Sequence, residues 1–235
     1  MLLDDKDKQT IIKELYTYID KNCIFRCDPS IKYNEDTEPG RLYPKYPTKS
    51  PVTHQFYLRR LTHNGRMLFF LTALFMDDLI KKIKAGQEND RIQIVGLETS
   101  SIPLMIGMQQ YAASNKIFLN TFTIRKERKG YGLFNLIDGM PTDDPYIVVD
   151  DLFNSGSTMR YCFDVCEYEL NIKPANNVYT IIKFDENTQA IKYKDHVINL
   201  YSVFSKNEFD MNYDPNVYWL PKDCDKSYNK RPEYF

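Results

Sequence analysis

The stretch YIVVDDLFNSGSTMRY, residues 146–161, decides the fold. Its first four residues are apolar and rich in β-branched side chains, which predicts a buried strand. Two carboxylates, Asp150 and Asp151, come directly after this strand, and a polar loop then leads into a helix pattern. Because ligands bind at the carboxyl ends of the strands in an open parallel sheet, we expect a functional site here.

The loop after the two carboxylates has the composition of a phosphate-binding loop. Its residues are Asn154, Ser155, Gly156, Ser157 and Thr158. Small side chains let backbone N–H groups approach an anion, the hydroxyls add donors, and the start of the following helix adds a positive dipole end. The neighbouring carboxylates can accept hydrogen bonds from sugar hydroxyls or assist a divalent cation. The pattern indicates a sugar phosphate site; the alternative is a solvated strand end followed by a capped turn.

On both sides of this unit, short apolar segments alternate with helix patterns. Strands are expected at residues 91–96, 116–124, 146–149, 178–182 and 197–204, and helices at 102–114 and 158–170. This alternation predicts an α/β fold with a parallel sheet of about five strands, flanked by helices on both faces.

The chain divides into three parts. Residues 1–54 hold a helix at 10–20 and a proline-rich stretch that predicts an extended arm or hood. Residues 55–204 form the core, in which a strand at 55–60 and a helix at 66–84 precede the alternating part. Residues 205–235 are polar and tyrosine-rich, and we expect them to wrap the core or form a small cap.

Composition excludes several classes of protein. The 235 residues are 43% hydrophobic, and 31 basic against 32 acidic side chains provide no general basic field for nucleic acid. No run of 18 apolar residues is present and five of the first ten residues are charged, so we expect a cytoplasmic protein without a membrane partner. Five cysteines, an odd number, fit reduced thiols; a zinc site built from two i,i+4 pairs is a less favoured alternative.

Residues 146–161 resemble the 5-phosphoribosyl-1-diphosphate (PRPP) motif of type I phosphoribosyltransferases, an apolar strand followed by D-D-x-x-T-x-G-x-T. Three further segments are similar to the orotate branch of that family and occur in the same order along the chain. They are FYLRRLTHNGRMLFF (56–70), GLETSSIPL (96–104) and RKERKGYGLFNLIDG (125–139). The resemblance spans about residues 56–204 and does not cover the two ends of the chain.

The resemblance implies a type I phosphoribosyltransferase fold with a small hood and a role for each motif. Asp150 and Asp151 would bind the ribose hydroxyls, and residues 154–158 the 5-phosphate. The pyrophosphate loop would contain Glu98, Thr99 and Ser100. The basic loop would bring Arg125, Lys126 and Lys129 to the pyrophosphate, with Tyr131 in the place of the branch's loop histidine. Mg²⁺ would be bound through the PRPP pyrophosphate, with no metal site of the protein's own, and the protein would be a homodimer.

Four departures from the orotate pattern affect the expected activity. Tyr131 replaces the loop histidine, Ser100-Ser101 replaces Lys-Gly or Gly-Gly, Asn154 replaces a threonine, and Lys183-Phe184 replaces a D-R pair whose arginine binds the orotate carboxylate. Two hypotheses follow. The first is an enzyme that transfers phosphoribose to a nitrogenous base and releases pyrophosphate. The second is a non-catalytic or conditional regulator or effector that binds PRPP or a nucleotide, for example in a bacterial antiviral defence system, and acts through a protein bound by the terminal segments.

Overall fold

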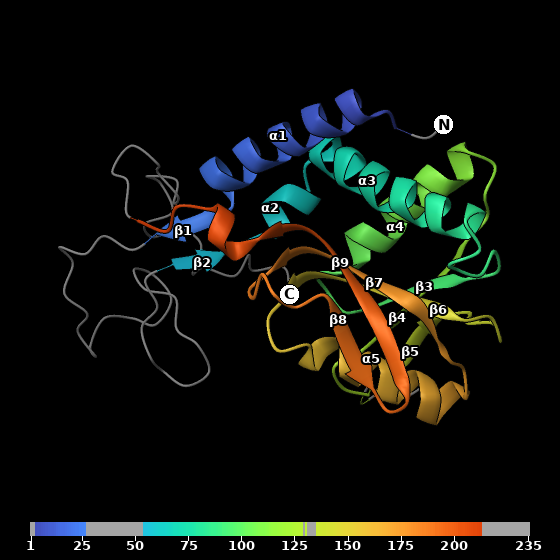
Figure 1. The fold of residues 1–235 in the computed structure, drawn as a ribbon. Helices are drawn as coiled ribbons and strands as arrows, with labels where there is room; N and C mark the ends of the chain where they lie inside the picture. Colours follow the sequence, from blue (N-terminus) through green and yellow to red (C-terminus); the bar gives the residue numbers. More distant parts are fainter. Residues whose placement is uncertain (1–2, 27–53, 129, 131–134, 213–235) are drawn as a thin grey trace, which may run out of the picture.

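The computed structural model describes residues 3–26, 54–128, 130 and 135–212, and a seven-stranded sheet forms its centre (Figure 1). The strand order is β5-β4-β3-β6-β7-β9-β8. The five inner strands are parallel: β3 (Gln93–Leu97), β4 (Asn120–Ile124), β6 (Tyr146–Phe153), β7 (Pro174–Lys183) and β9 (His196–Ser205). The predicted five-stranded parallel sheet is therefore confirmed.

Two short antiparallel strands at the sheet edges were not predicted. They are β5 (Ile137–Gly139), which pairs with β4, and β8 (Ala190–Tyr193), which pairs with β9. Each has only three or four residues and is not fully buried. The three residues of β5 are too few to show the alternation on which a sequence prediction depends, and the four of β8 alternate in burial only over the shortest length that such a prediction uses.

Helices cover both faces of the sheet (Figure 1). One face carries α3 (Gly65–Lys84) and α4 (Ile102–Ser114), with α1 (Asp5–Asn22) packed against α3. The other carries α5 (Ser157–Val165), which continues as one π-helical turn, η1 (Cys166–Leu170). The α1 and α3 helices and the helix after the phosphate loop all occur where the periodicity predicted them. No helix in the described ranges is long and apolar enough to cross a membrane.

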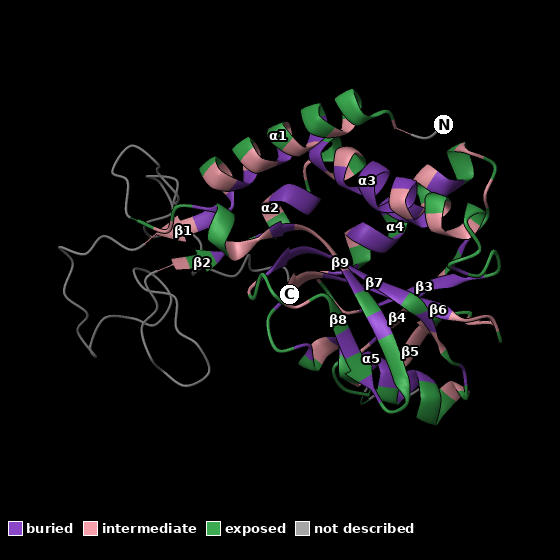
Figure 2. Ribbon diagram, in the orientation of Figure 1, coloured by how far each residue is buried: buried purple, intermediate pink, exposed green. Residues whose placement is uncertain are grey.

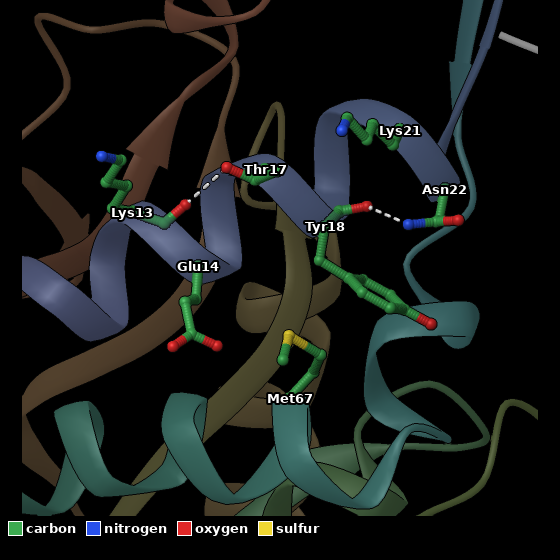
Figure 3. A pocket seen from close by; sticks show the side chains of 7 residues that line it. All are labelled: Lys13, Glu14, Thr17, Tyr18, Lys21, Asn22 and Met67. Carbon is green, nitrogen blue, oxygen red and sulfur yellow. Dashed lines mark hydrogen bonds between the residues drawn. The ribbon is translucent and has the colours of Figure 1, made fainter.

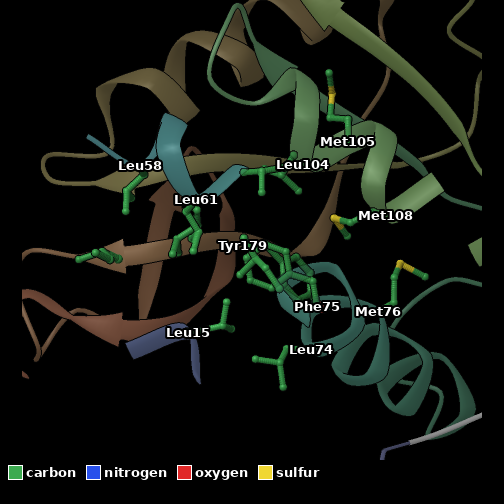
Figure 4. Close-up of a cluster of buried hydrophobic side chains, with 14 of the residues drawn as sticks. Leu15, Leu58, Leu61, Leu74, Phe75, Met76, Leu104, Met105, Met108 and Tyr179 are labelled. Carbon is green, nitrogen blue, oxygen red and sulfur yellow. The ribbon is translucent and has the colours of Figure 1, made fainter. Parts of the chain in front are cut away.

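The core has two layers because the central strands β3, β6 and β7 are largely buried on both sides (Figure 2). On β6, Ile147 and Val149 face the α3–α4 layer, whereas Val148 faces the α5 layer. In the first layer Phe75 of α3 packs on Tyr179 of β7, with ring centroids 5.4 Å apart (Figure 4). This packing holds the carboxyl ends of the strands in fixed positions.

A small hood stands beside this edge of the sheet. It consists of β1 (Ile24–Arg26), β2 (His54–Phe56) and α2 (Arg59–Thr62). The predicted strand at 55–60 was right only as far as Phe56, because Leu58 and Leu61 are both fully buried at helical spacing and turn the chain into α2.

The chain after β9 returns to the hood and to α1. Phe209 follows the 3₁₀ turn η2 (Lys206–Glu208) and stacks on Tyr16, with centroids 4.9 Å apart and planes inclined by 8°. Arg26 donates through Nε to the Asp210 carbonyl at 2.7 Å. Residues 205–212 therefore connect the last strand to the N-terminal part of the chain.

A buried carboxylate fastens α1 to α3. Asp77 is 1% exposed, accepts a hydrogen bond from the Leu3 N–H at 2.8 Å, and forms ion pairs with Lys8 at 2.6 Å and Lys81 at 3.1 Å. Burial by itself would raise the pKa of Asp77, but the donors of Lys8, Leu3 and Lys81 outweigh it and lower that pKa.

We expect Asp77→Asn to lower the free energy of unfolding by about 1–3 kcal/mol at pH 7, because it leaves two lysines without their carboxylate. Because the pKa of Asp77 is lower in the folded chain than in the unfolded chain, its carboxylate stabilises the protein at pH values above its unfolded-state pKa of about 4. This stabilisation is lost as the pH falls through the folded-state pKa of Asp77. Urea unfolding at pH 7 and pH 3 measures this. The exposed Asp90→Asn is the control. Equal stability of the wild type and Asp77→Asn at pH 7 would contradict the stabilising role of the Asp77 carboxylate.

Candidate functional site

The two adjacent carboxyl groups lie in the last part of β6, which extends four residues beyond the predicted end. Asp150 is 5% exposed and accepts hydrogen bonds from the Asp151 N–H at 2.9 Å and from the Ser100 hydroxyl at 3.4 Å. Burial, followed by the nearby Asp151 carboxylate, raises the pKa of Asp150 well above its usual range. A ligand that donates hydrogen bonds would compensate this buried acceptor.

The loop after β6 surrounds a small hollow. Its lining is formed by Asp150, Leu152, Phe153, residues 154–158 and Met159, and its volume is about 160 Å³. Gly156 has φ of 74°, and a Cβ there would lie 3.0 Å from the Phe153 ring, so the turn requires glycine. Ser157 begins α5, and therefore the positive end of the helix dipole faces the hollow. The structure thus brings Asp150 and residues 154–158 together, in an arrangement suited to a phosphate group.

A second loop, between β3 and α4, borders the carboxyl pair. Ser100 contacts Asp150, and Thr99 accepts a hydrogen bond from the Arg59 guanidinium of α2 at 2.9 Å. Arg59 was not among the residues expected to bind PRPP; the sequence indicated it only as a cation that could compensate for the missing arginine of the D-R pair. The only sequence signal for it was the Arg59-Arg60 pair in the segment similar to the family's hairpin.

The first residues of the basic loop, after β4, are attached to their own chain. The Arg125 guanidinium pairs with Glu98 at 3.2 Å and with Asp138. Arg128 pairs with Glu169, and Lys126 is exposed. Lys129 and Tyr131, two of the four expected catalytic residues, lie outside the described residues.

At the end of β7, Lys183 and Phe184 occupy the positions of the D-R pair, and neither provides a cation that is available to a ligand. Lys183 is 8% exposed, and its ammonium donates to the carbonyls of Glu186 and Thr188, both at 2.9 Å. The Phe184 ring lies 6.0 Å from the Phe56 ring of the hood, and the Lys206 ammonium lies 5.3 Å from its centre. The Lys183 ammonium therefore stabilises the turn that follows β7.

The donor set fits a metal ion that arrives with its ligand. Among the described residues, no three His, Cys, Asp or Glu side chains converge to hold an ion. Mg²⁺ is commonly held by one or two carboxylates together with substrate phosphates, and Asp150 and Asp151 provide such a pair. Cys162 and Cys166 are unpaired and fully buried in the α5 layer, and burial raises the pKa of Cys166 to about 12, so both thiols are packing groups.

A larger hollow, of about 350 Å³, lies between α1 and α3 (Figure 3). Its lining residues are Lys13, Glu14, Thr17, Tyr18, Lys21, Asn22 and Met67. The Thr17 hydroxyl and the Asn22 amide both donate to carbonyls of α1 itself, and Glu14 pairs with Arg66 at 2.6 Å. These three polar groups already have partners, so they are not directed at a ligand.

No family model matches the chain. Among solved structures, it is similar to a phosphoribosyltransferase from Corynebacterium diphtheriae (TM-score 0.58, 15% identity, 85% of this chain and 98% of that chain). It is also similar to the Mycobacterium tuberculosis H37Rv orotate phosphoribosyltransferase (0.60, 15%, 84% and 98%) and to the Saccharomyces cerevisiae adenine phosphoribosyltransferase (0.54, 14%, 83% and 99%). The M. tuberculosis enzyme has also been solved in complex with PRPP (0.52, 14%, 88% and 94%). The chain therefore has the type I phosphoribosyltransferase fold.

Proposed function

We propose that this protein binds PRPP at the carboxyl edge of its sheet. The 5-phosphate occupies the hollow formed by residues 154–158, the ribose hydroxyls donate to Asp150 and Asp151, and the diphosphate lies toward residues 98–100. The observation that carries the proposal is the buried Asp150 carboxyl group, which borders both the hollow at the start of α5 and the loop after β3. The fold shared with a PRPP-bound enzyme supports it.

The reaction that suits this site is transfer of phosphoribose to a nitrogenous base with release of pyrophosphate. Its transition state is oxocarbenium-like while negative charge grows on the leaving group, so the site must stabilise an anion and exclude water. Mg²⁺ on the diphosphate would take part of that charge. Lys126, exposed beside Glu98, and Lys129, farther along the loop, are the proposed cationic contacts, and Tyr131 takes the position of the proton donor.

A second candidate is a regulator that binds PRPP without turning it over. It is favoured by the pairing of Arg125 with Glu98 and Asp138, which occupies the guanidinium that a leaving pyrophosphate would need. The position of Lys183 supports it as well, because this ammonium is already held by two carbonyls of its own turn.

Calorimetric titration with PRPP in the presence of Mg²⁺ tests the shared part of both candidates. Saturable binding supports the proposal, and no binding at millimolar PRPP contradicts it. PRPP consumption with a panel of purines, pyrimidines and nicotinate then separates the candidates. Turnover with one base identifies an enzyme, whereas tight binding with no consumption identifies a regulator.

We also propose that the protein is a homodimer. Three apolar side chains are exposed on neighbouring helices: Phe69 of α3, and Ile102 and Ile106 of α4. This exposed apolar surface supports a dimer in which a second copy of the chain covers it. Light scattering is expected to give twice the 27.8 kDa of one chain. A charge introduced by Ile106→Glu should shift the mass toward one chain, while the exposed Val197→Glu on β9 should not. A wild type that stays monomeric at 100 μM would contradict this prediction.

A further inference from the structure

Glu98 places a carboxylate in the loop that, under the proposed function, faces the diphosphate. Its side chain is 26% exposed. One carboxyl oxygen pairs with the Arg125 guanidinium, and the other accepts the Lys126 N–H, each at 3.2 Å. Glu98 therefore connects this loop to the first two residues of the basic loop.

Both terminal nitrogens of the Arg125 guanidinium are engaged by its own chain, whereas the buried Nε has no partner among the described residues. One terminal nitrogen pairs with Glu98 and the other with Asp138. Asp138 is itself held by the amide of Asn135 at 2.7 Å. The Tyr161 hydroxyl lies 3.2 Å from the Arg125 carbonyl, which fastens the backbone to α5. If Arg125 turned to a bound anion, Glu98 and Asp138 would each lose an ion pair and keep only their other hydrogen bonds.

The charges around the loop do not favour a free diphosphate. Three cationic side chains of the described residues lie at or beside the loop, and four carboxyl groups accompany them. The cations are Arg59, Arg125 and Lys126; the carboxyl groups are those of Glu98, Asp138, Asp150 and Asp151. Burial disfavours the charged form of Asp150, since it raises the pKa of that group, and the other three carboxylates balance the three cations. A diphosphate carries several negative charges, so this set provides no net attraction for it unless a cation accompanies it.

We infer that Glu98 is a specificity-determining residue that makes the site reject metal-free diphosphates. Its carboxylate keeps Arg125 paired and opposes the incoming anion, so a diphosphate enters only as its complex with a divalent cation. The inference rests on the proposed function for the position of the diphosphate. In this inference Arg125 holds the basic loop against the loop after β3, and the lysines of the basic loop are the groups that contact the diphosphate.

The probe is inorganic pyrophosphate, titrated by calorimetry into the wild type, Glu98→Gln and Glu127→Gln, first with EDTA and then with Mg²⁺. Glu127 is an exposed carboxylate in the same basic loop and provides the matched change of net charge. In EDTA, we expect Glu98→Gln to bind pyrophosphate at least about tenfold more tightly than the wild type, since it loses a repelling charge and frees one edge of Arg125. With Mg²⁺ the two affinities should agree within about threefold.

The outcomes separate this inference from the proposed function. Equal affinities of Glu98→Gln and Glu127→Gln in EDTA would overturn the inference, even if the wild type binds PRPP with Mg²⁺. Failure of the wild type to bind PRPP with Mg²⁺ would overturn the proposed function, while a gain specific to Glu98→Gln would still establish the role of Glu98. If Glu98→Gln does not fold, Asp138→Asn decides. It frees the other edge of Arg125, and its failure to tighten metal-free binding would overturn the inference.

Discussion

Replacing both Asp150 and Asp151 by asparagine should weaken PRPP binding at least about 100-fold. Each carboxylate accepts hydrogen bonds from ribose hydroxyls in the proposed complex, and a hydrogen bond to a charged group is worth about 1.5–3 kcal/mol. Because 1.4 kcal/mol corresponds to a factor of ten, two weakened contacts suffice for this loss. Calorimetry on the double variant measures it, and an unchanged affinity would remove the donor-site proposal.

The stability of Asp150→Asn provides the control for this experiment. A carboxyl group with a raised pKa binds its proton more tightly in the folded than in the unfolded chain, so stability falls as the pH rises from about 4 toward the folded-state value. Asparagine carries no charge and avoids this loss. Asp150→Asn should therefore be at least as stable as the wild type at pH 7. Thermal unfolding of this variant and of the double variant checks that lost binding does not come from a lost fold.

Orotate should be a poor acceptor, by at least about two orders of magnitude against a preferred base. A bidentate guanidinium contact to its carboxylate cannot be made by Phe184, and Lys183 is held by two carbonyls of its own turn. The Lys206 ammonium lies near the Phe184 ring but offers only a point charge. Removing one partner of a desolvated charge pair costs about 2–5 kcal/mol, which accounts for the expected size of the effect.

The measurement follows the loss of orotate absorbance with PRPP and Mg²⁺, beside the same panel of bases. Phe184→Arg should raise orotate binding, whereas Phe184→Leu, which only changes the packing against Phe56, should not. Formation of orotidylate by the wild type at typical enzyme rates, about 1–1000 per second, would contradict the prediction.

The parts of the fold that could be predicted are those whose signal is local. The central strands β3, β6 and β7 contain largely apolar runs because both of their faces are buried, and the loop proposed to bind phosphate lies with the two carboxylates within nine residues, 150–158. The edge strands β5 and β8 are too short for such a signal. Their positions depend on pairing with β4 and β9, which no short stretch of sequence reveals.

The candidate site shows the same division between local and long-range information. The ion pairs of Arg125 join residues 27 and 13 positions away, and the contact of Arg59 with Thr99 joins residues 40 positions apart. The orientation of Lys183 depends on carbonyls of the following turn. A basic run in the sequence predicts positive charge near a ligand, but only the folded chain reveals which of those charges is already neutralised.

The contacts of residues 205–212 with the N-terminal part also bear on how the chain is completed during synthesis. Tyr16 donates to the Glu208 carbonyl and Arg26 to the Asp210 carbonyl, across sequence separations of 192 and 184 residues. Contacts between residues so far apart in the sequence form late, because the chain must be synthesised as far as residue 210 before the two partners can meet. The nascent chain can therefore form α1, the hood and the strands before β9 while these elements still lack their contacts with residues 205–212.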